Sequence, residues 1–218
     1  MIHIFILSIQ EDEQRRAHVL RVKAKLTQKG IDCTIVNAYY WKSHDIHARL
    51  KAKGMTFKPT LSLSQLACFL SHSHLWSILS NLKPGTLPIV LEDDMDLSDR
   101  FDMGELEQAV LSLERPHDAI LLWKHPEQAN KQATLPVLQS YFSPFYYTWG
   151  LAAYMFTPAF AKQLLSIQHI DMPVDEILLH RFYPKSNTYV AIPQHFVNLG
   201  LLGNVDYGPY VFQSNIWK

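Results

Sequence analysis

Four acidic side chains crowd into five positions at the end of an apolar run. Residues 87–91 are apolar, and Glu92, Asp93, Asp94 and Asp96 follow them directly. Like charges so close together repel one another and raise each other's pKa unless a cation or hydrogen-bond donors compensate. Mg²⁺ and Mn²⁺ prefer oxygen ligands of this kind and keep coordination positions open for substrate phosphates. The pattern predicts a divalent metal site in which Glu92 and Asp94, an acid–X–acid pair, hold an ion bound to a diphosphate.

The alternative to a metal site is an ordinary solvated turn. Acids that follow a strand often form turns or cap the next helix, and the residue types alone leave both interpretations open. Asp96 and Asp99 are better explained as turn formers, because they lie just ahead of the segment 100–106, "RFDMGEL".

Two histidines in "SHSHLW", His72 and His74, suggest zinc at first sight. Residues two apart on a helix do not face each other, so this pair does not predict a zinc site. We expect His72 to be a hydrogen-bonded structural histidine or to orient a ligand, and Trp76 to lie in the core.

These residues need a scaffold, and the chain alternates strands with helices along its length. Residues 2–9 form a continuous apolar run, which is typical of a strand covered on both faces. Strand, helix and strand in about 38 residues make a βαβ unit, hence a parallel sheet and an α/β fold. Ligands of such sheets bind beyond the carboxyl ends of the strands, where the acids lie. Strands are expected at 2–9, 31–38, 87–91, 118–123, 148–157 and 188–193, and helices at 11–30, 44–54, 61–85, 104–114, 158–168 and 173–184.

Three helix ends carry clear signals. Ser62 and Gln65 make a capping-box pattern. Thr157 and Pro158 fit an N-cap and the first helical position. Gly30 closes the first helix.

Composition excludes several classes of protein. Lys plus Arg and Asp plus Glu both number 20 among the 218 residues, so no basic field is present to hold nucleic acid. The first apolar run is about nine residues long, against the roughly 20 that a membrane span needs. It also lacks the basic start and the cleavage site of a signal peptide. Cys33 and Cys68 lie alone in apolar surroundings, which fits reduced core thiols in a cytosolic protein, and a disulfide is possible but not needed.

Several stretches, in this order, resemble glycosyltransferase family 25. They are "IFILSIQEDEQRR", "LSLSQLACFLSHSHLW", "PIVLEDDMDL", "TWGLAAYMFTPAFAKQLL" and "MPVDEILL", and the resemblance covers residues 2 to about 195. The "SH..LW" helix followed by "VLEDD" is the specific part. This is the lipooligosaccharide-biosynthesis galactosyltransferase family, whose animal relatives glycosylate collagen hydroxylysine. The resemblance implies a GT-A-like fold with a mostly parallel central sheet, a UDP-sugar donor, Mn²⁺ or Mg²⁺, and transfer with inversion.

The resemblance leads to one specific hypothesis: a cytoplasmic β-galactosyltransferase that moves galactose from UDP-galactose to a lipooligosaccharide core sugar. One domain would span 1–218, with 1–123 as the nucleotide-sugar-binding half and 124–218 holding the acceptor and the catalytic base. The alternatives are a transferase that uses UDP-glucose or a UDP-N-acetylhexosamine, and an inactive nucleotide-sugar-binding module. Peripheral contact with the cytoplasmic face of the inner membrane is left open, and nucleic acid is not an expected partner.

The family chemistry gives the two acidic stretches their roles. Asp94 is the expected direct metal ligand, with Glu92 and Asp93 supporting it or touching the ribose. Inversion needs a carboxylate that takes the acceptor proton. Asp175 is the expected base and Glu176 the reserve, because they begin a helix whose dipole favours the ionised form. Helix capping by Asp175 is the plainer interpretation, and a capping carboxylate still keeps one oxygen free.

Donor contacts are expected from the first strand and the helix after it. The family has a similar "RR" near the nucleotide, so Arg15 and Arg16 are candidates for the phosphates, although one of them suits a solvated helix face equally well. Ser8 ends the first strand and is a candidate for the uracil or the ribose. Family members usually carry an acidic "DA" after the second strand, whereas this chain has Asn37 there.

Later candidates come from three further stretches. Trp149 and Gly150 offer a stacking surface and a close backbone approach, with a tightly packed strand as the alternative. His195 is a candidate third metal ligand. The segment 124–147 has three prolines and no clear period, which makes it our candidate for an acceptor loop or lid.

Overall fold

A seven-stranded sheet forms the centre of the computed structural model, which describes residues 1–113, 116–123, 142–144, 151–191 and 194–199. The strand order is β2-β1-β4-β8-β6-β10-β7. β1, β2 and β4 are parallel, as are β6 and β10, whereas β8 and β7 run antiparallel to their neighbours. The strands are β1 (Ile2–Ser8), β2 (Asp32–Asn37), β4 (Leu87–Glu92), β6 (Ala119–Leu121), β7 (Phe142–Pro144), β8 (Ala153–Phe156) and β10 (Thr188–Ala191). The prediction of an α/β fold with a mostly parallel sheet is confirmed.

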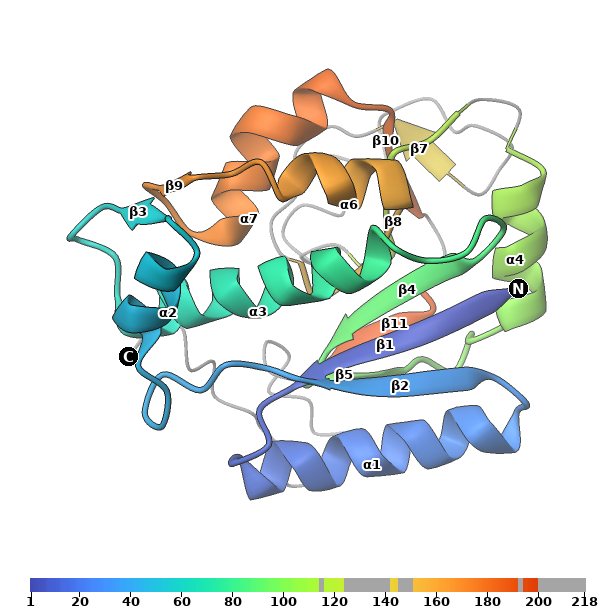
Figure 1. Cartoon of the computed structure of the whole chain (residues 1–218). Helices are drawn as coiled ribbons and strands as arrows, with labels where there is room; N and C mark the ends of the chain where they lie inside the picture. The colour runs from blue at the N-terminus through green and yellow to red at the C-terminus, as the bar shows by residue number, and fades with distance from the viewer. Residues whose placement is uncertain (114–115, 124–141, 145–150, 192–193, 200–218) are drawn as a thin grey trace.

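Helices cover both faces of this sheet (Figure 1). The helix α1 lies on one face, and α3, α6 and α7 lie together on the other. Their bounds, with those of the helices at the edges, are α1 (Glu13–Gln28), α2 (Ile46–Ala52), α3 (Leu63–Leu79), α4 (Met103–Leu111), α6 (Pro158–Leu164) and α7 (Val174–Ile177).

A hydrophobic core lies on each face of the sheet, and β1 contributes to both because its side chains alternate between the two faces. Ile4 and Ile6 pack into the cluster that includes α1, and Phe5 and Leu7 pack into the cluster that includes α3. Burial on both faces is the physical reason for the continuous apolar run in the sequence.

The predicted helix ends are confirmed. Gln65 N donates to Ser62 Oγ at 3.2 Å, and Ser62 N donates to Gln65 Oε1 at 2.9 Å, which completes the capping box of α3. Thr157 accepts from Phe160 N at the start of α6. Gly30 has a φ of 72°, a left-handed conformation that favours glycine after a helix.

Some expectations from the sequence are wrong in detail. Asp96 is not a turn former, because it is buried in the short strand β5 (Met95–Leu97) and binds Lys25 Nζ at 3.0 Å. Asp175 does not cap its helix, since Pro173 occupies the N-cap position and Asp175 lies in the first turn of α7. The expected helix at 173–184 divides into α7, a π-helical turn and a 3-10 turn.

Small paired strands complete the described structure. β5 pairs antiparallel with β11 (Phe196–Asn198), and β3 (Thr56–Phe57) pairs parallel with β9 (His169–Ile170). Within the segment 124–147, for which no period is visible in the sequence, residues 142–144 form β7. The rest of that segment, with Trp149 and Gly150, lies outside the described residues.

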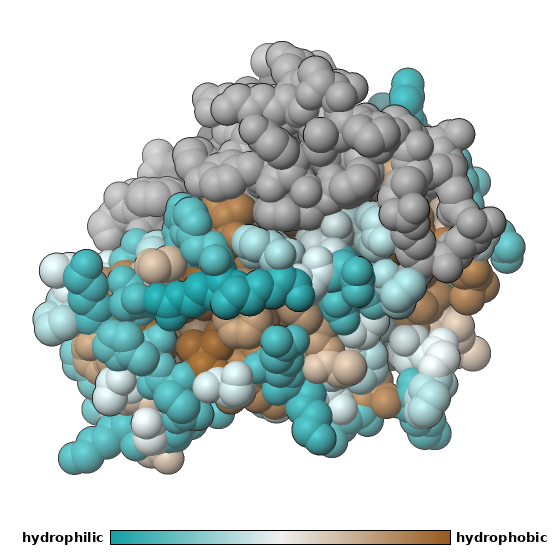
Figure 2. All heavy atoms as spheres, turned by 90° about the horizontal axis from the view of Figure 1, so that it is seen from above, coloured by the Kyte–Doolittle hydropathy of each residue, from teal (hydrophilic) through white to brown (hydrophobic). Residues whose placement is uncertain are grey.

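The outer surface is polar on the side of α6 and α7. Figure 2 shows hydrophilic side chains over most of the coloured part of this face, with apolar ones in small groups between them. Among the helices of the described ranges, each is too short or too polar to cross a bilayer.

Candidate functional site

An open pocket lies beyond the carboxyl ends of β1, β2 and β4, where parallel sheets bind ligands. It holds about 650 Å³ of space not filled by protein atoms, part of which is open solvent at its mouth. Five segments line it. They contribute Leu7 and Ile9 after β1, Arg15 from α1, Ala38, Tyr39 and Trp41 after β2, Ser64, Ala67, Cys68, Ser71 and His72 from α3, and Glu92, Asp93 and Asp94 at the end of β4.

Asp93 and Asp94 form the turn that joins β4 to β5. Asp93 accepts from Ile9 N at 3.3 Å and is paired with the guanidinium of Arg15. Asp94 Oδ1 accepts from Asn198 Nδ2 at 3.1 Å, and Asp94 Oδ2 lies 3.9 Å from Arg15 Nη1. The acidic turn is therefore held in place by the ends of β1, α1 and β11.

The charges of this turn are poorly compensated by the protein. Burial, together with the charge of Glu92, raises the pKa of Asp94 to about 7. Burial also raises the pKa of Asp93, although Arg15 opposes the rise. Burial alone would lower the pKa of Arg15, but the charges of Asp93 and Asp94 outweigh it and raise that pKa. A divalent cation with oxygen ligands fits this turn, because it would supply the positive charge that the carboxylates lack.

We expect Arg15→Ala to lower the free energy of unfolding by about 3–5 kcal/mol above pH 7, because it leaves two buried carboxylates without their guanidinium partner. Urea denaturation measures the effect. Arg16→Ala is the matched control, since Arg16 donates to Asn37 Oδ1 at 3.2 Å and such an exposed contact contributes about 0–1 kcal/mol. Equal losses in the two variants would contradict the assignment.

His72 is hydrogen-bonded on both ring nitrogens. Its Nδ1 lies 3.0 Å from Tyr154 Oη, and its Nε2 lies 3.1 Å from Glu92 Oε1. The ring is fully buried at the inner wall of the pocket. These contacts join α3, β8 and β4 around one end of the site.

The two acids of α7 face different surroundings. Burial raises the pKa of Asp175, and the charges of Glu176 and Glu92 raise it further. Burial raises the pKa of Cys68, which lines the pocket, and the charges of Glu92 and Asp175 add to that rise. Glu176 instead contacts His180 Nε2 at 2.9 Å on the exposed side of the helix. Asp175 is not among the residues that line the pocket, but unlike Glu176 it is close enough to interact electrostatically with Glu92 and Cys68, which are.

Two of the predicted donor contacts lie at the margin of the site. Arg16 binds Asn37, the residue that stands where the family usually has an acid. The hydroxyl of Ser8 is buried, and no described residue is its hydrogen-bond partner. Its neighbours Leu7 and Ile9 line the pocket.

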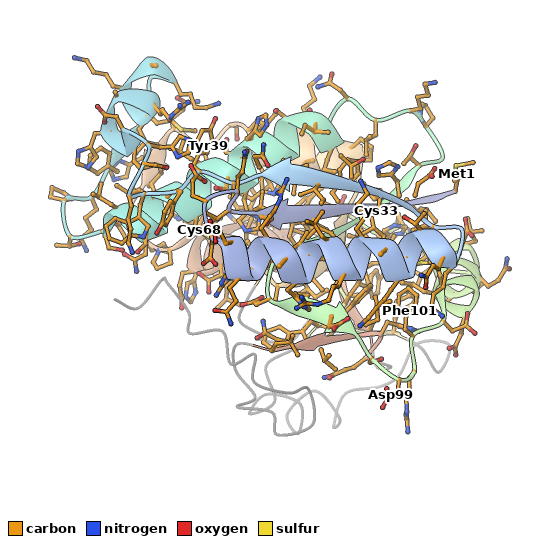
Figure 3. The ribbon with its side chains drawn as sticks, turned by 90° about the horizontal axis from the view of Figure 1, so that it is seen from below. Met1, Cys33, Tyr39, Cys68, Asp99 and Phe101 are labelled. Atoms are coloured by element: carbon orange, nitrogen blue, oxygen red, sulfur yellow. The ribbon has the colours of Figure 1, made fainter. Side chains whose placement is uncertain are left out.

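The structure does not bring His195 to the acidic turn. His195 Nδ1 accepts from Asp102 N at 3.2 Å, and its ring lies 6.4 Å from that of Phe101. Figure 3 places Phe101 toward the end of the molecule opposite to Cys68 and Tyr39. The antiparallel pairing of β5 with β11 sets Asn198, and not His195, beside Asp94. We therefore leave His195 out of the proposed ligands.

Sequence reasoning missed several residues of the site, and four of them bear on its chemistry. Tyr39 and Trp41 line the pocket directly after β2, and their place after an expected strand was a usable signal. Cys68 lies one helical turn before His72 on α3, a spacing that puts both on one face. No local pattern marks Asn198, because strand pairing alone brings it to Asp94.

The known proteins that this chain resembles include glycosyltransferases and members of glycosyltransferase families. Curated relatives include the probable inactive glycosyltransferase 25 family member 3 of Rattus norvegicus, 28% identical over 80% of this chain and 32% of that protein. Procollagen galactosyltransferase 1 of Danio rerio is 25% identical over 80% of this chain and 30% of its own length. The chain thus spans about a third of the length of the curated relatives it matches.

The fold has a solved counterpart. A glycosyltransferase involved in the glycosylation of the major capsid of PBCV-1 aligns with a TM-score of 0.53 at 8% identity, over 91% of this chain and 92% of that one. Residues 1–178 match the model of glycosyltransferase family 25, described as an LPS biosynthesis protein. The chain therefore belongs to glycosyltransferase family 25.

Proposed function

We propose that this chain is a metal-dependent, inverting glycosyltransferase that moves a hexosyl group from a UDP-sugar to a hydroxyl of an oligosaccharide. The observation that carries the proposal is the buried acidic turn in the pocket, where the pKa of Asp94 is raised to about 7. A protein has little reason to bury such charge at a sheet edge unless a cation binds there.

The residues from 1 to 123 would bind the donor. Tyr39 and Trp41, which line the pocket, would be the aromatic contacts of the uracil. Arg15 holds Asp93 in place and offers guanidinium donors to the diphosphate. Ser8 remains a candidate for the nucleoside, because its buried hydroxyl has no partner among the described residues.

Asp94, supported by Glu92, would hold Mn²⁺ or Mg²⁺. When bound, such an ion offsets the charge that develops on the leaving diphosphate. Asn198 keeps the Asp94 carboxylate in one orientation through its amide. Arg15 limits the repulsion within the turn before any ligand arrives.

Asp175 would act as the base. It would accept the proton of the acceptor hydroxyl while that oxygen attacks the anomeric carbon from the face opposite to UDP. Burial raises the pKa of this carboxylate, which makes it a stronger base than an exposed aspartate. Glu176 is the alternative base, although its carboxylate contacts His180 on the exposed side of the helix.

The finer assignment is transfer of galactose from UDP-galactose to a lipooligosaccharide core sugar. The name of the relative procollagen galactosyltransferase 1 supports galactose, and the family description as an LPS biosynthesis protein supports the acceptor. That acceptor class would place the reaction at the cytoplasmic face of the inner membrane. UDP-glucose and UDP-N-acetylhexosamines are the alternative donors.

A second candidate function is a nucleotide-sugar-binding module without catalysis. The specific observation in its favour is that curated relatives at 28% identity are named inactive or probable inactive members of the family. The binding module would keep the pocket but would not turn over its ligand.

A survey of UDP release separates these functions. The protein is incubated with Mn²⁺ and, in turn, UDP-galactose, UDP-glucose and UDP-N-acetylhexosamines, with and without oligosaccharide acceptors, while calorimetry measures UDP binding. Release that is fastest with UDP-galactose, and faster still with acceptor, supports the full assignment. Binding of UDP without release from any donor would favour the binding module, and no binding would overturn both.

A further inference from the structure

Three potential metal ligands of different chemistry converge at the inner wall of the pocket. They are the thiol of Cys68 and the imidazole of His72, both on α3, and the carboxylate of Glu92 at the end of β4. One ligand atom from each lies within 4.8 Å of the other two, and His72 Nε2 lies 3.1 Å from Glu92 Oε1. Four residues apart on one helix, Cys68 and His72 share a face, so the backbone itself sets this geometry.

The combination of sulfur, nitrogen and oxygen distinguishes this group from the acidic turn. Sulfur and imidazole nitrogen are ligands for Zn²⁺ and Co²⁺, whereas Mg²⁺ and Mn²⁺ prefer oxygen alone. Three protein ligands with a free fourth position are the arrangement of open zinc sites. All three residues line the pocket, so a fourth ligand could reach the ion from there.

The surroundings support an ion at this place. Tyr154 Oη lies 3.0 Å from His72 Nδ1. A partner on the second ring nitrogen is a regular feature of metal-bound histidines, because it fixes the ring. It would aim Nε2 at the ion, whose bonds to His72 and Glu92 would replace the present contact between Nε2 and Glu92 Oε1. Burial, and with it the charges of Glu92, Asp175, Asp93 and Asp94, raises the pKa of the Cys68 thiol, so the sulfur would give up its proton only as a cation binds. The same negative field attracts a divalent cation.

We propose that Cys68 Sγ, His72 Nε2 and a Glu92 oxygen bind one Zn²⁺ or Co²⁺ ion per chain, with the fourth position open to the pocket. Binding forms the metal–sulfur bond and releases the thiol proton to solvent. This site is separate from the Mn²⁺ or Mg²⁺ site proposed at Asp94, and Glu92, with two carboxylate oxygens, lies between them. The inference does not depend on the transfer reaction.

Cobalt absorption tests the site. Metal-free, untagged full chain is titrated with Co²⁺, and a thiolate-to-cobalt charge-transfer band is expected to grow until one equivalent is bound. Zn²⁺ should abolish the band by competition, and Mn²⁺ at the same concentration should not. Absence of the band in the wild-type protein, or displacement by Mn²⁺ as readily as by Zn²⁺, would overturn the proposal.

The chain offers a matched control because it has two cysteines. Cys33 lies in β2, half-buried, away from Cys68 (Figure 3). Cys68→Ser should remove the band, and Cys33→Ser should retain it. If Cys68→Ser fails to fold, the wild-type band together with its persistence in Cys33→Ser still assigns the sulfur. A band that persists in Cys68→Ser and disappears in Cys33→Ser would refute the site.

Two further variants separate this site from the proposed function. Tyr154→Phe should weaken Co²⁺ binding about 10- to 100-fold without removing the band, as expected for a partner of a ligand. Asp94→Asn should keep the band even where UDP release is lost. A band that vanishes in Asp94→Asn would mean that the ion sits in the acidic turn and not on α3.

Discussion

Asp94→Asn is expected to lower turnover about 10²- to 10³-fold, equivalent to roughly 3–4 kcal/mol of transition-state stabilisation. The variant keeps the size of the side chain and one oxygen that can accept from Asn198, but it replaces the other oxygen by an NH₂ donor. It also removes the charge that would hold the divalent ion. Mn²⁺-dependent binding of UDP should weaken at the same time. Initial rates of UDP release and calorimetry with UDP and Mn²⁺ measure the two effects.

Asp94→Asn should still fold, because the raised pKa of Asp94 shows that the ionised carboxylate does not stabilise the folded protein. In the folded protein the pKa of Asp94 is about 7, above the ordinary value of 3.8, so ionising it costs stability as the pH rises between these values. The neutral asparagine avoids that cost. Without divalent ions above pH 7, the variant should melt at the same temperature as the wild type or higher.

Asp99→Asn is the matched control for this prediction. Asp99 is an exposed acid a few residues further along the chain, and its replacement removes the same charge outside the pocket. Turnover and UDP binding should not change in the control. Wild-type turnover in Asp94→Asn would remove the metal role, and a lower melting temperature would contradict the account of its buried charge.

Asp175→Asn is expected to lower kcat about 10²- to 10⁴-fold, the usual contribution of a general base. Binding of UDP should not change, because Asp175 would act on the acceptor and not on the nucleotide. Single-turnover rates and UDP calorimetry separate the two. Donor hydrolysis in the absence of acceptor should fall less than transfer, since water is a smaller nucleophile with other routes to lose its proton.

Glu176→Gln is the neighbouring control, and pH adds an independent measurement. Glu176 contacts His180, so its loss should leave kcat close to the wild-type value. Activity requires ionised Asp175, whose pKa is raised by burial. The acidic limb of the wild-type kcat profile should therefore lie above the range of an ordinary aspartate. A strong effect of Glu176→Gln with none of Asp175→Asn would exchange their roles.

Much of the scaffold follows from local sequence. The apolar run of β1, the capping box at Ser62 and Gln65 and the glycine after α1 depend on neighbouring residues in the chain, so their signals are readable in order. The acids after β4 could be placed at the pocket because the carboxyl ends of parallel strands share one edge. The family could be recognised from the same short stretches.

The sequence was less informative wherever a long-range partner decides the outcome. Asp96 resembled a turn residue, but Lys25 and the pairing of β5 with β11 made it a buried strand residue. β8 was expected as a strand, yet only its neighbours β4 and β6 set it antiparallel. His195 looked like a late metal ligand, although the register of β11 places it by Asp102.

By itself, the sequence determined the α/β class, the family and the position of the acidic turn at the rim of the sheet. Only the tertiary structure decided which side chains meet there: Asn198 with Asp94, Tyr154 with His72, and Cys68 with Glu92. The physical reason is that hydrogen bonds and charges act over a few ångströms in space. Segments as many as 104 residues apart in the chain come within that reach only when the sheet and its helices have packed.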